Sequence, residues 1–180
     1  MIRITVPDKE WWDDKNEEFV YSRGCTLQLE HSLVSLSKWE SKYCKPFLTK
    51  EDKSVSEMVD YIRCMTLTQN VPSNVYNNIS DANFKEIEKY IESPMTATFF
   101  GQEAYRGSSG EQVTAELIYY WMITLNIPFE CQKWHLNRLL TLIRVCTIKN
   151  KPNKRRSTRE IMRRNSALNS SRRKHYNTRG

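Results

Sequence analysis

The sequence predicts a mostly α-helical protein. It should begin with a small N-terminal antiparallel β-sheet or hairpin, continue as a compact helical bundle, and end in a basic, partly disordered C-terminal tail. Three observations predict this organisation. Apolar residues alternate with polar ones before residue 31, helix caps precede apolar residues at helical spacing up to residue 148, and Lys and Arg crowd the remainder. We therefore divide the chain into residues 1–31, 32–148 and 149–180.

The N-terminal segment carries the pattern of short strands. Ile2, Ile4 and Val6 alternate with polar residues, which places their side chains on one face of a strand. Residues 19–21 and 26–30 show further strand signals. Antiparallel pairing among these segments predicts the small sheet.

Three helices are expected between residues 32 and 92. Ser32 is a suitable N-cap for a helix that reaches Tyr43. Ser54 and Glu57 match a capping box, in which each side chain satisfies a backbone N–H group of the other residue. Ser80 or Asp81 is expected to cap the third helix, and apolar residues follow all three caps at spacings of three and four.

Two apolar helices joined at Pro128 are the longest apolar part of the chain. Ser108 and Glu111 form a second potential capping box, and the helix after them is apolar over most of its circumference, so we expect it in the middle of the domain. We expect the next helix, as far as Cys146, to pack antiparallel against it. Core packing is favoured over nucleic-acid stacking for the aromatic residues of this pair, Tyr119, Tyr120, Trp121 and Trp134.

Charge is distributed unevenly along the chain. Residues 149–180 hold twelve of the 28 Lys and Arg residues but a single acidic residue, Glu160, so this tail has a net charge of about +11. The other residues hold sixteen basic and twenty acidic side chains and are net negative. A separable basic tail indicates an anionic partner, either nucleic acid or an acidic protein surface. The alternative is a solvated tail that keeps the protein soluble.

The sequence contains no recognisable catalytic motif, and we expect neither enzymatic activity nor a cofactor. The five cysteines include no CxxC pair, and we expect them to be reduced thiols of a cytosolic protein. We find no secretory signal and no apolar run long enough to cross a membrane. Cys131 and His135 have the spacing of a metal-ligand pair, but a buried thiol and a hydrogen-bonded histidine are the favoured interpretation.

Several segments of the sequence resemble those of tail assembly chaperones of long-tailed bacteriophages. They are SLSKWESK (35–42), KPFL (45–48), IYYWMITLNIPFE (118–130) and KWHLNRLLTLIRVC (133–146), and the basic segment 149–161 is also similar. The resemblance extends from about residue 26 to residue 165. It implies a non-enzymatic protein of the host cytoplasm that binds the long helical tape measure protein and keeps it soluble. The tail tube protein and further copies of the chain are additional expected partners.

Seven residues are candidate partner contacts. Trp39 and Phe47 lie in the segments that resemble the family, and Trp134 lies at the start of the last strongly predicted helix. Under this hypothesis four arginines of the tail face an acidic partner: Arg155, Arg156, Arg163 and Arg164. Packing or solvation is the alternative for each of them. Two other functions stay open: a small nucleic-acid-binding protein that acts through its basic tail, and a minor structural protein of a virion.

Overall fold

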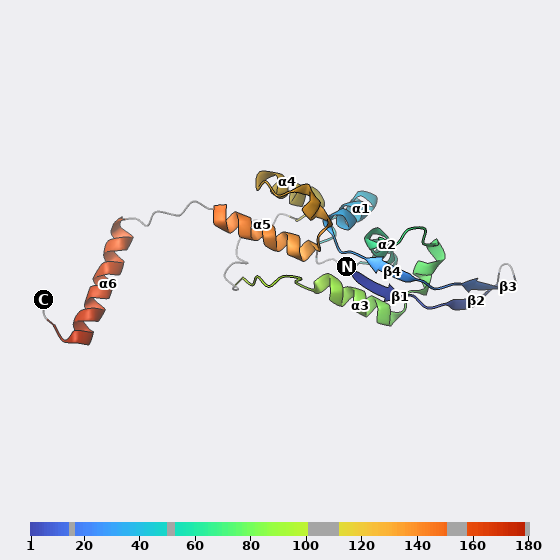
Figure 1. The fold of residues 1–180 in the computed structure, drawn as a ribbon, viewed down its shortest axis with the longest axis horizontal. Helices are drawn as coiled ribbons and strands as arrows, with labels where there is room; N and C mark the ends of the chain where they lie inside the picture. The colour runs from blue at the N-terminus through green and yellow to red at the C-terminus, as the bar shows by residue number, and fades with distance from the viewer. Residues whose placement is uncertain (15–16, 50–52, 101–111, 151–157, 179–180) are drawn as a thin grey trace. The chain divides into compact units, whose positions relative to one another are not determined.

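A computed structural model describes residues 1–14, 17–49, 53–100, 112–150 and 158–178. The chain forms two units, Met1–Thr147 and Ile148–Gly180. The first unit is mostly helical and carries a small antiparallel β element, as predicted (Figure 1). The predicted boundary after residue 148 lies one residue from the division between the units.

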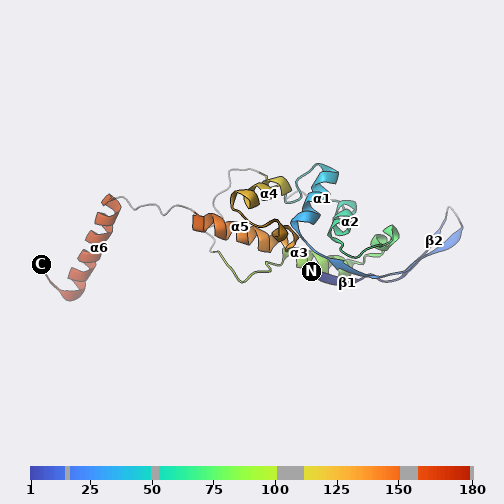
Figure 2. The same cartoon turned by 45° about the horizontal axis from the view of Figure 1, so that its top comes forward.

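The N-terminal β element is a long two-stranded ribbon. β1 (Ile2–Thr5) pairs with β4 (Thr26–Leu29), and β2 (Lys9–Asp13) pairs with β3 (Glu18–Ser22). Both pairs share one register, and a hydrogen bond from the Val6 N–H to the Cys25 carbonyl at 2.9 Å continues it between them. The β2–β3 end projects away from the helices (Figures 1 and 2). The strand at β2 was not predicted, because the charged residues on both sides of Trp11 and Trp12 obscure the strand preference of these two aromatic residues.

Gly24 lies where the two strands of the ribbon approach most closely. A Cβ atom at this position would lie 2.1 Å from the Val6 carbonyl oxygen and 2.5 Å from the Pro7 carbonyl carbon. The Gly24 N–H also donates to Asp8 Oδ1 at 2.6 Å. The absence of a side chain therefore allows the ribbon to bend here without separating its strands.

We expect Gly24→Ala to destabilise the first unit by about 1–3 kcal/mol, because the added methyl group forces backbone atoms apart. Chemical unfolding measures the free energy, and amide hydrogen exchange should show lost protection in β2 and β3. Arg23→Ala, at the neighbouring exposed position, is the matched control. Equal stability of the two variants would contradict the steric argument.

Three helices follow the ribbon and begin at the predicted caps. α1 (Leu33–Tyr43) starts after Ser32, α2 (Val55–Met65) after Ser54, and α3 (Asp81–Glu92) after Ser80. In each case the side chain of the cap serine accepts a hydrogen bond from the backbone N–H three residues later. The side chain of that later residue accepts a hydrogen bond from the backbone N–H of the serine. A short 3-10 helix, η1 (Ser73–Asn78), separates α2 from α3.

The apolar helical pair differs from its prediction in three respects. α4 (Ala115–Thr124) begins after an N-cap at Thr114, whereas the expected capping box at 108–111 lies outside the described residues. A 3-10 helix, η3 (Phe129–Lys133), separates α4 from α5 (Leu136–Asn150). α4 packs against α1, and its opposite side is exposed.

One apolar core joins the ribbon to the helices of the first unit. The N-terminal β element therefore belongs to this unit instead of forming a separate part at 1–31. The largest fully buried side chains of the core come from β1, β4 and the helices α1 to α4: Ile4, Leu27, Leu29, Leu33, Leu36, Trp39, Tyr61, Ile62, Met65, Ile87, Ile118 and Met122.

The described part of the second unit is made up mainly of the helix α6 (Thr158–Tyr176), together with the last residues of α5, 148–150. Every described side chain of this helix is exposed. The predicted disorder of the tail falls partly on residues 151–157, which lie outside the described residues. Among the described helices of the whole chain, none is long and apolar enough to cross a membrane.

Candidate functional site

The outer face of α4 and η3 leaves apolar side chains uncovered. Tyr120 and Ile123 are each 59% exposed and Phe129 is 53% exposed. Tyr119 links them, because it precedes Ile123 by one helical turn and its ring lies 6.5 Å from that of Phe129. A hydrogen bond from the Tyr119 hydroxyl to Gln132 Oε1 at 2.9 Å ties α4 to η3. We call the exposed set Tyr120, Ile123 and Phe129 the α4 face.

The α4 face corrects the prediction that α4 lies in the middle of the domain. Ala115, Ile118 and Met122 point into the core and are fully buried, whereas the opposite side of the helix is open. The sequence preference for core packing is therefore wrong for Tyr120. It holds in part for Tyr119 and Trp121, which are half-buried against the core.

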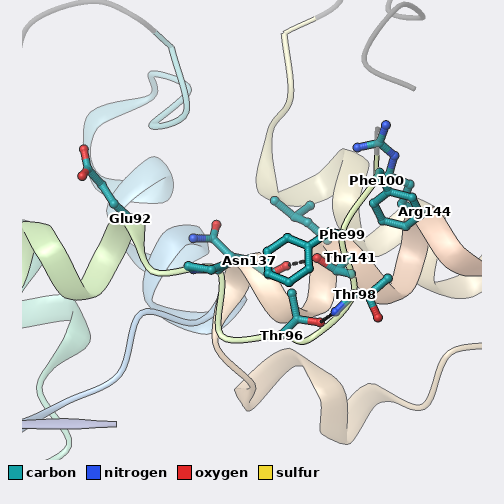
Figure 3. A pocket seen from close by; sticks show the side chains of 10 residues that line it. Glu92, Thr96, Thr98, Phe99, Phe100, Asn137, Thr141 and Arg144 are labelled. Carbon is teal, nitrogen blue, oxygen red and sulfur yellow. Dashed lines mark hydrogen bonds between the residues drawn. The ribbon is translucent and has the colours of Figure 1, made fainter. Parts of the chain in front are cut away.

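A pocket of about 470 Å³ lies between α5 and the segment 94–100 (Figure 3). Phe99, Leu140 and Pro94 supply apolar walls, and threonine hydroxyl groups interrupt them. Phe99 is 81% exposed at the rim. Glu92 and Arg144 flank the pocket at opposite ends, so the two charges do not converge on one point (Figure 3).

The side chains around this pocket are held by neighbouring groups. The Arg144 guanidinium lies over the Phe100 ring, 4.3 Å from its centroid. Asn137 Nδ2 donates to the carbonyls of Ile91 and Ser93, both at 2.9 Å, which fixes the end of α3 against α5. These bonds satisfy carbonyl groups that a helix end leaves without intrahelical partners. The pocket therefore has mixed apolar and polar walls and holds no cluster of acid and base groups.

Two histidines are buried next to each other beneath these helices. The rings of His31 and His135 lie 5.1 Å apart in an edge-to-face arrangement. His31 Nδ1 is hydrogen-bonded to the Tyr61 hydroxyl at 2.6 Å. Burial, assisted by the nearby His135, lowers the pKa of His31 from 6.5 to about 3. Burial also lowers the pKa of His135, so both rings are neutral at pH 7.

The contacts of His135 explain its tautomer and leave no nitrogen for a metal. The Asn137 N–H donates to Nδ1 at 3.3 Å, so Nε2 carries the proton and donates to the Tyr90 carbonyl at 3.1 Å. Cys131 is a buried free thiol nearby in the sequence. Within the described residues no three His, Cys, Asp or Glu side chains are grouped to hold a metal ion.

Glu40 is a buried carboxylate that the sequence did not single out. It is 7% exposed. Its Oε1 accepts from the Phe47 N–H at 2.8 Å, and its Oε2 accepts from the Ala115 N–H at 2.7 Å. Ala115 is the first residue of α4, where a negative charge is favoured by the helix dipole. Both oxygens are engaged by backbone groups, so Glu40 is a structural residue that joins α1 to α4.

The structure places the seven candidate contacts in three different environments. Trp39 is 1% exposed and donates from Nε1 to the Glu57 carbonyl at 3.0 Å, and Phe47 is 7% exposed and stacks on Tyr61. Both are core residues, which corrects the expectation that they touch a partner. Trp134 is half-buried beneath the Arg138 guanidinium, 4.1 Å from its ring centroid.

The structure describes two of the four tail arginines. Arg163 and Arg164 are exposed on α6. Arg155 and Arg156 lie outside the described residues. The surface that sequence reasoning missed is the α4 face, for which the available signal was an unusually apolar helix with no polar side.

No protein family, curated protein or solved structure matches this chain.

Proposed function

We propose that this chain is a non-enzymatic chaperone that covers apolar helix faces of a long helical partner before that partner is assembled. The resemblance of its sequence to tail assembly chaperones makes the tape measure protein of a long-tailed bacteriophage the proposed partner, in the host cytoplasm. The tail tube protein is the proposed competitor, since its arrival would release the chaperone.

The observation that carries this proposal is the α4 face. Three large apolar side chains on one helix and the adjoining 3-10 turn are each more than half exposed. Exposed apolar patches mark interaction sites, because leaving such groups in water forgoes burial free energy. Tyr120 and Ile123 are three residues apart and form a ridge that fits between the apolar residues of another helix.

Two hollows add further apolar surface at separate places. One is the pocket beside α5. The other, of about 410 Å³, lies between the start of α2 and α3, with Val55, Met58 and Phe84 as apolar lining and charged residues at its edge. Several modest apolar contacts suit a chaperone that must leave its partner, because each contact is weak and the sum is adjustable.

The proposal predicts that co-expression with a tape measure fragment raises the soluble fraction of that fragment, and that Tyr120→Ser with Ile123→Ser reduces this rescue at least several-fold. The fragment is taken from a long helical reading frame next to the gene of this chain, and the absence of such a frame would also contradict the proposal. Soluble and pelleted fragment are compared on gels after lysis. Leu48→Ser with Leu67→Ser, which removes two exposed apolar side chains elsewhere, is the matched control. Failure of the unmodified chain to solubilise the fragment would contradict the proposal, as would equal rescue by both double variants.

Binding of nucleic acid through the tail is the second candidate, favoured by the exposure of α6 and its excess of arginine. The same co-expression with residues 149–180 removed distinguishes the two. Continued rescue by the shortened chain supports the chaperone. Loss of rescue together with loss of co-purifying DNA or RNA would favour the nucleic-acid function.

A further inference from the structure

The projecting end of the ribbon has one face that is both aromatic and acidic. We call residues 8–22 the arm. Glu10 lies opposite Tyr21 and Trp12 lies opposite Phe19 in the ladder, and paired residues of a ribbon share a face. The Tyr21 hydroxyl donates to Asp8 Oδ2 at 2.8 Å, which places that carboxylate beside the same face.

Three aromatic side chains on this face of the arm are uncovered. Trp12 is 48% exposed, Tyr21 59% and Phe19 68%. The rings of Trp12 and Phe19 contact each other edge to face at 4.9 Å. A two-stranded ribbon is marginally stable in water, and three exposed aromatic rings on one of its faces provide a surface that another element would cover with a gain of free energy.

The arm also carries the excess negative charge of residues 1–148. Its six Asp and Glu residues outnumber its two Lys residues, and the rest of residues 1–148 carries fourteen charges of each sign. The negative charge of that part of the chain is therefore concentrated on the element whose aromatic face is open. A partner of this face must supply positive charge and groups that pack on aromatic rings.

The helix α6 has this chemistry. Six of its residues are Arg or Lys and one is acidic. Arginine pairs with carboxylates through two hydrogen bonds and stacks on aromatic rings. Met162 and Leu168 are exposed among the arginines, at 65% and 46%, and a methionine side chain packs favourably against aromatic rings.

We propose that the aromatic and acidic face of the arm binds the basic helix α6 of a second copy of this chain. Within the first unit, the C-terminal end of α5 lies at the opposite end from the arm (Figures 1 and 2). The tail therefore leaves the unit on the side away from its own arm, which favours the arm of another copy. This self-association does not depend on the proposed chaperone function.

The proposed contact is head to tail, since each copy offers one arm and one α6. Such a contact uses two different surfaces, so it extends into open chains or closes into rings instead of stopping at a symmetric dimer. Because opposite charges at the surface drive it, the association weakens as salt is added.

Charge reversal in the full-length, nuclease-treated protein tests this contact. The arm variant is Glu10→Lys, Asp14→Lys; Asp8 is kept because it holds Gly24. The tail variant is Arg163→Glu, Arg164→Glu, Arg173→Glu. Sedimentation velocity is measured at about 50 mM and about 0.5 M salt for the unmodified chain, each variant, and an equimolar mixture of the two variants.

The unmodified chain is expected to form oligomers at low salt that dissociate at high salt. Each variant alone should remain monomeric, with association at least tenfold weaker. The mixture should associate again into oligomers that hold the two variants in equal amounts. The reversed arm of one variant fits the reversed tail of the other, and the two unmodified elements also fit each other. The tail variant leaves the first unit untouched, so its loss of association is not a folding defect.

Three results would overturn the proposal. A monomeric unmodified chain at low salt would show that the arm and α6 do not join separate copies, whether or not they meet within one chain. A mixture that stays monomeric would show that the two charged elements are not partners. Association that disappears on nuclease treatment would assign α6 to nucleic acid.

Discussion

Replacing Glu40 by alanine is expected to lower the free energy of unfolding by about 3 kcal/mol. The substitution removes two hydrogen bonds to a buried carboxylate, and each such bond contributes about 1.5–3 kcal/mol. It leaves the N–H groups of Phe47 and Ala115 without these acceptors, at 2.8 and 2.7 Å from the lost oxygens. It also removes a negative charge from the start of α4.

Glu40→Gln is the informative control for this effect. The amide keeps the shape and one acceptor, but its NH2 group must face a backbone N–H, so we expect an intermediate loss. Denaturant unfolding of both variants measures the series, and hydrogen exchange should show the loss centred on the start of α4. A stability of Glu40→Ala equal to that of the unmodified chain would show that the bridge between α1 and α4 contributes nothing.

The starts of α1, α2 and α3 could be predicted because a helix cap is a local interaction. Ser32, Ser54 and Ser80 each bond a backbone group only three residues away. Everything that specifies these boundaries is therefore present in four consecutive residues. The same reasoning did not find the N-cap at Thr114, because a potential box at Ser108 and Glu111 presents a competing local signal.

The β2 strand and the open side of α4 could not be read from local pattern. β2 is rich in charged residues and becomes a strand through its pairing with β3. The composition of residues 9–13 does not predict this partner. The apolar circumference of α4 correctly indicates that one side is buried. Which side remains open depends on the neighbouring elements, and the exposure of Tyr120 and Ile123 follows from the position of α4 against α1.

The partner-contact residues were the weakest part of the sequence prediction for a physical reason. Trp39 and Phe47 were selected because the segments around them resemble those of a known family. Nothing in their spacing distinguishes a surface aromatic residue from a buried one. Glu40, next to Trp39, was overlooked because its two hydrogen-bond partners are 7 and 75 residues away in the sequence. Contacts between residues far apart in the sequence determine which side chains are buried. A single sequence does not reveal these contacts.

The first unit is expected to lose about 2 kcal/mol of stability between pH 7.5 and pH 5 through His31. The pKa of this buried ring is about 3 in the folded protein and about 6.5 when exposed. As pH falls below 6.5 the unfolded chain takes up a proton that the folded chain does not, so the unfolded state is favoured. The lowered pKa of His135 acts in the same direction.

Urea unfolding at a series of pH values from 7.5 to 5 tests this expectation. The range stops at pH 5 because hydrogen bonds lower the pKa of Asp8, Glu57 and Asp60, so these carboxylates lose their stabilising charge only in stronger acid. His31→Gln keeps a polar side chain near the Tyr61 hydroxyl but cannot take up a proton. It should be less stable at pH 7.5 and show a shallower dependence on pH. An unchanged dependence would assign the acid sensitivity to His135 or to another group.

Because His31 and His135 lie where the start of α5 meets the ribbon and α3, loss of amide protection on acidification should appear first at Leu136. The N–H of this residue donates to the His31 carbonyl at 2.7 Å.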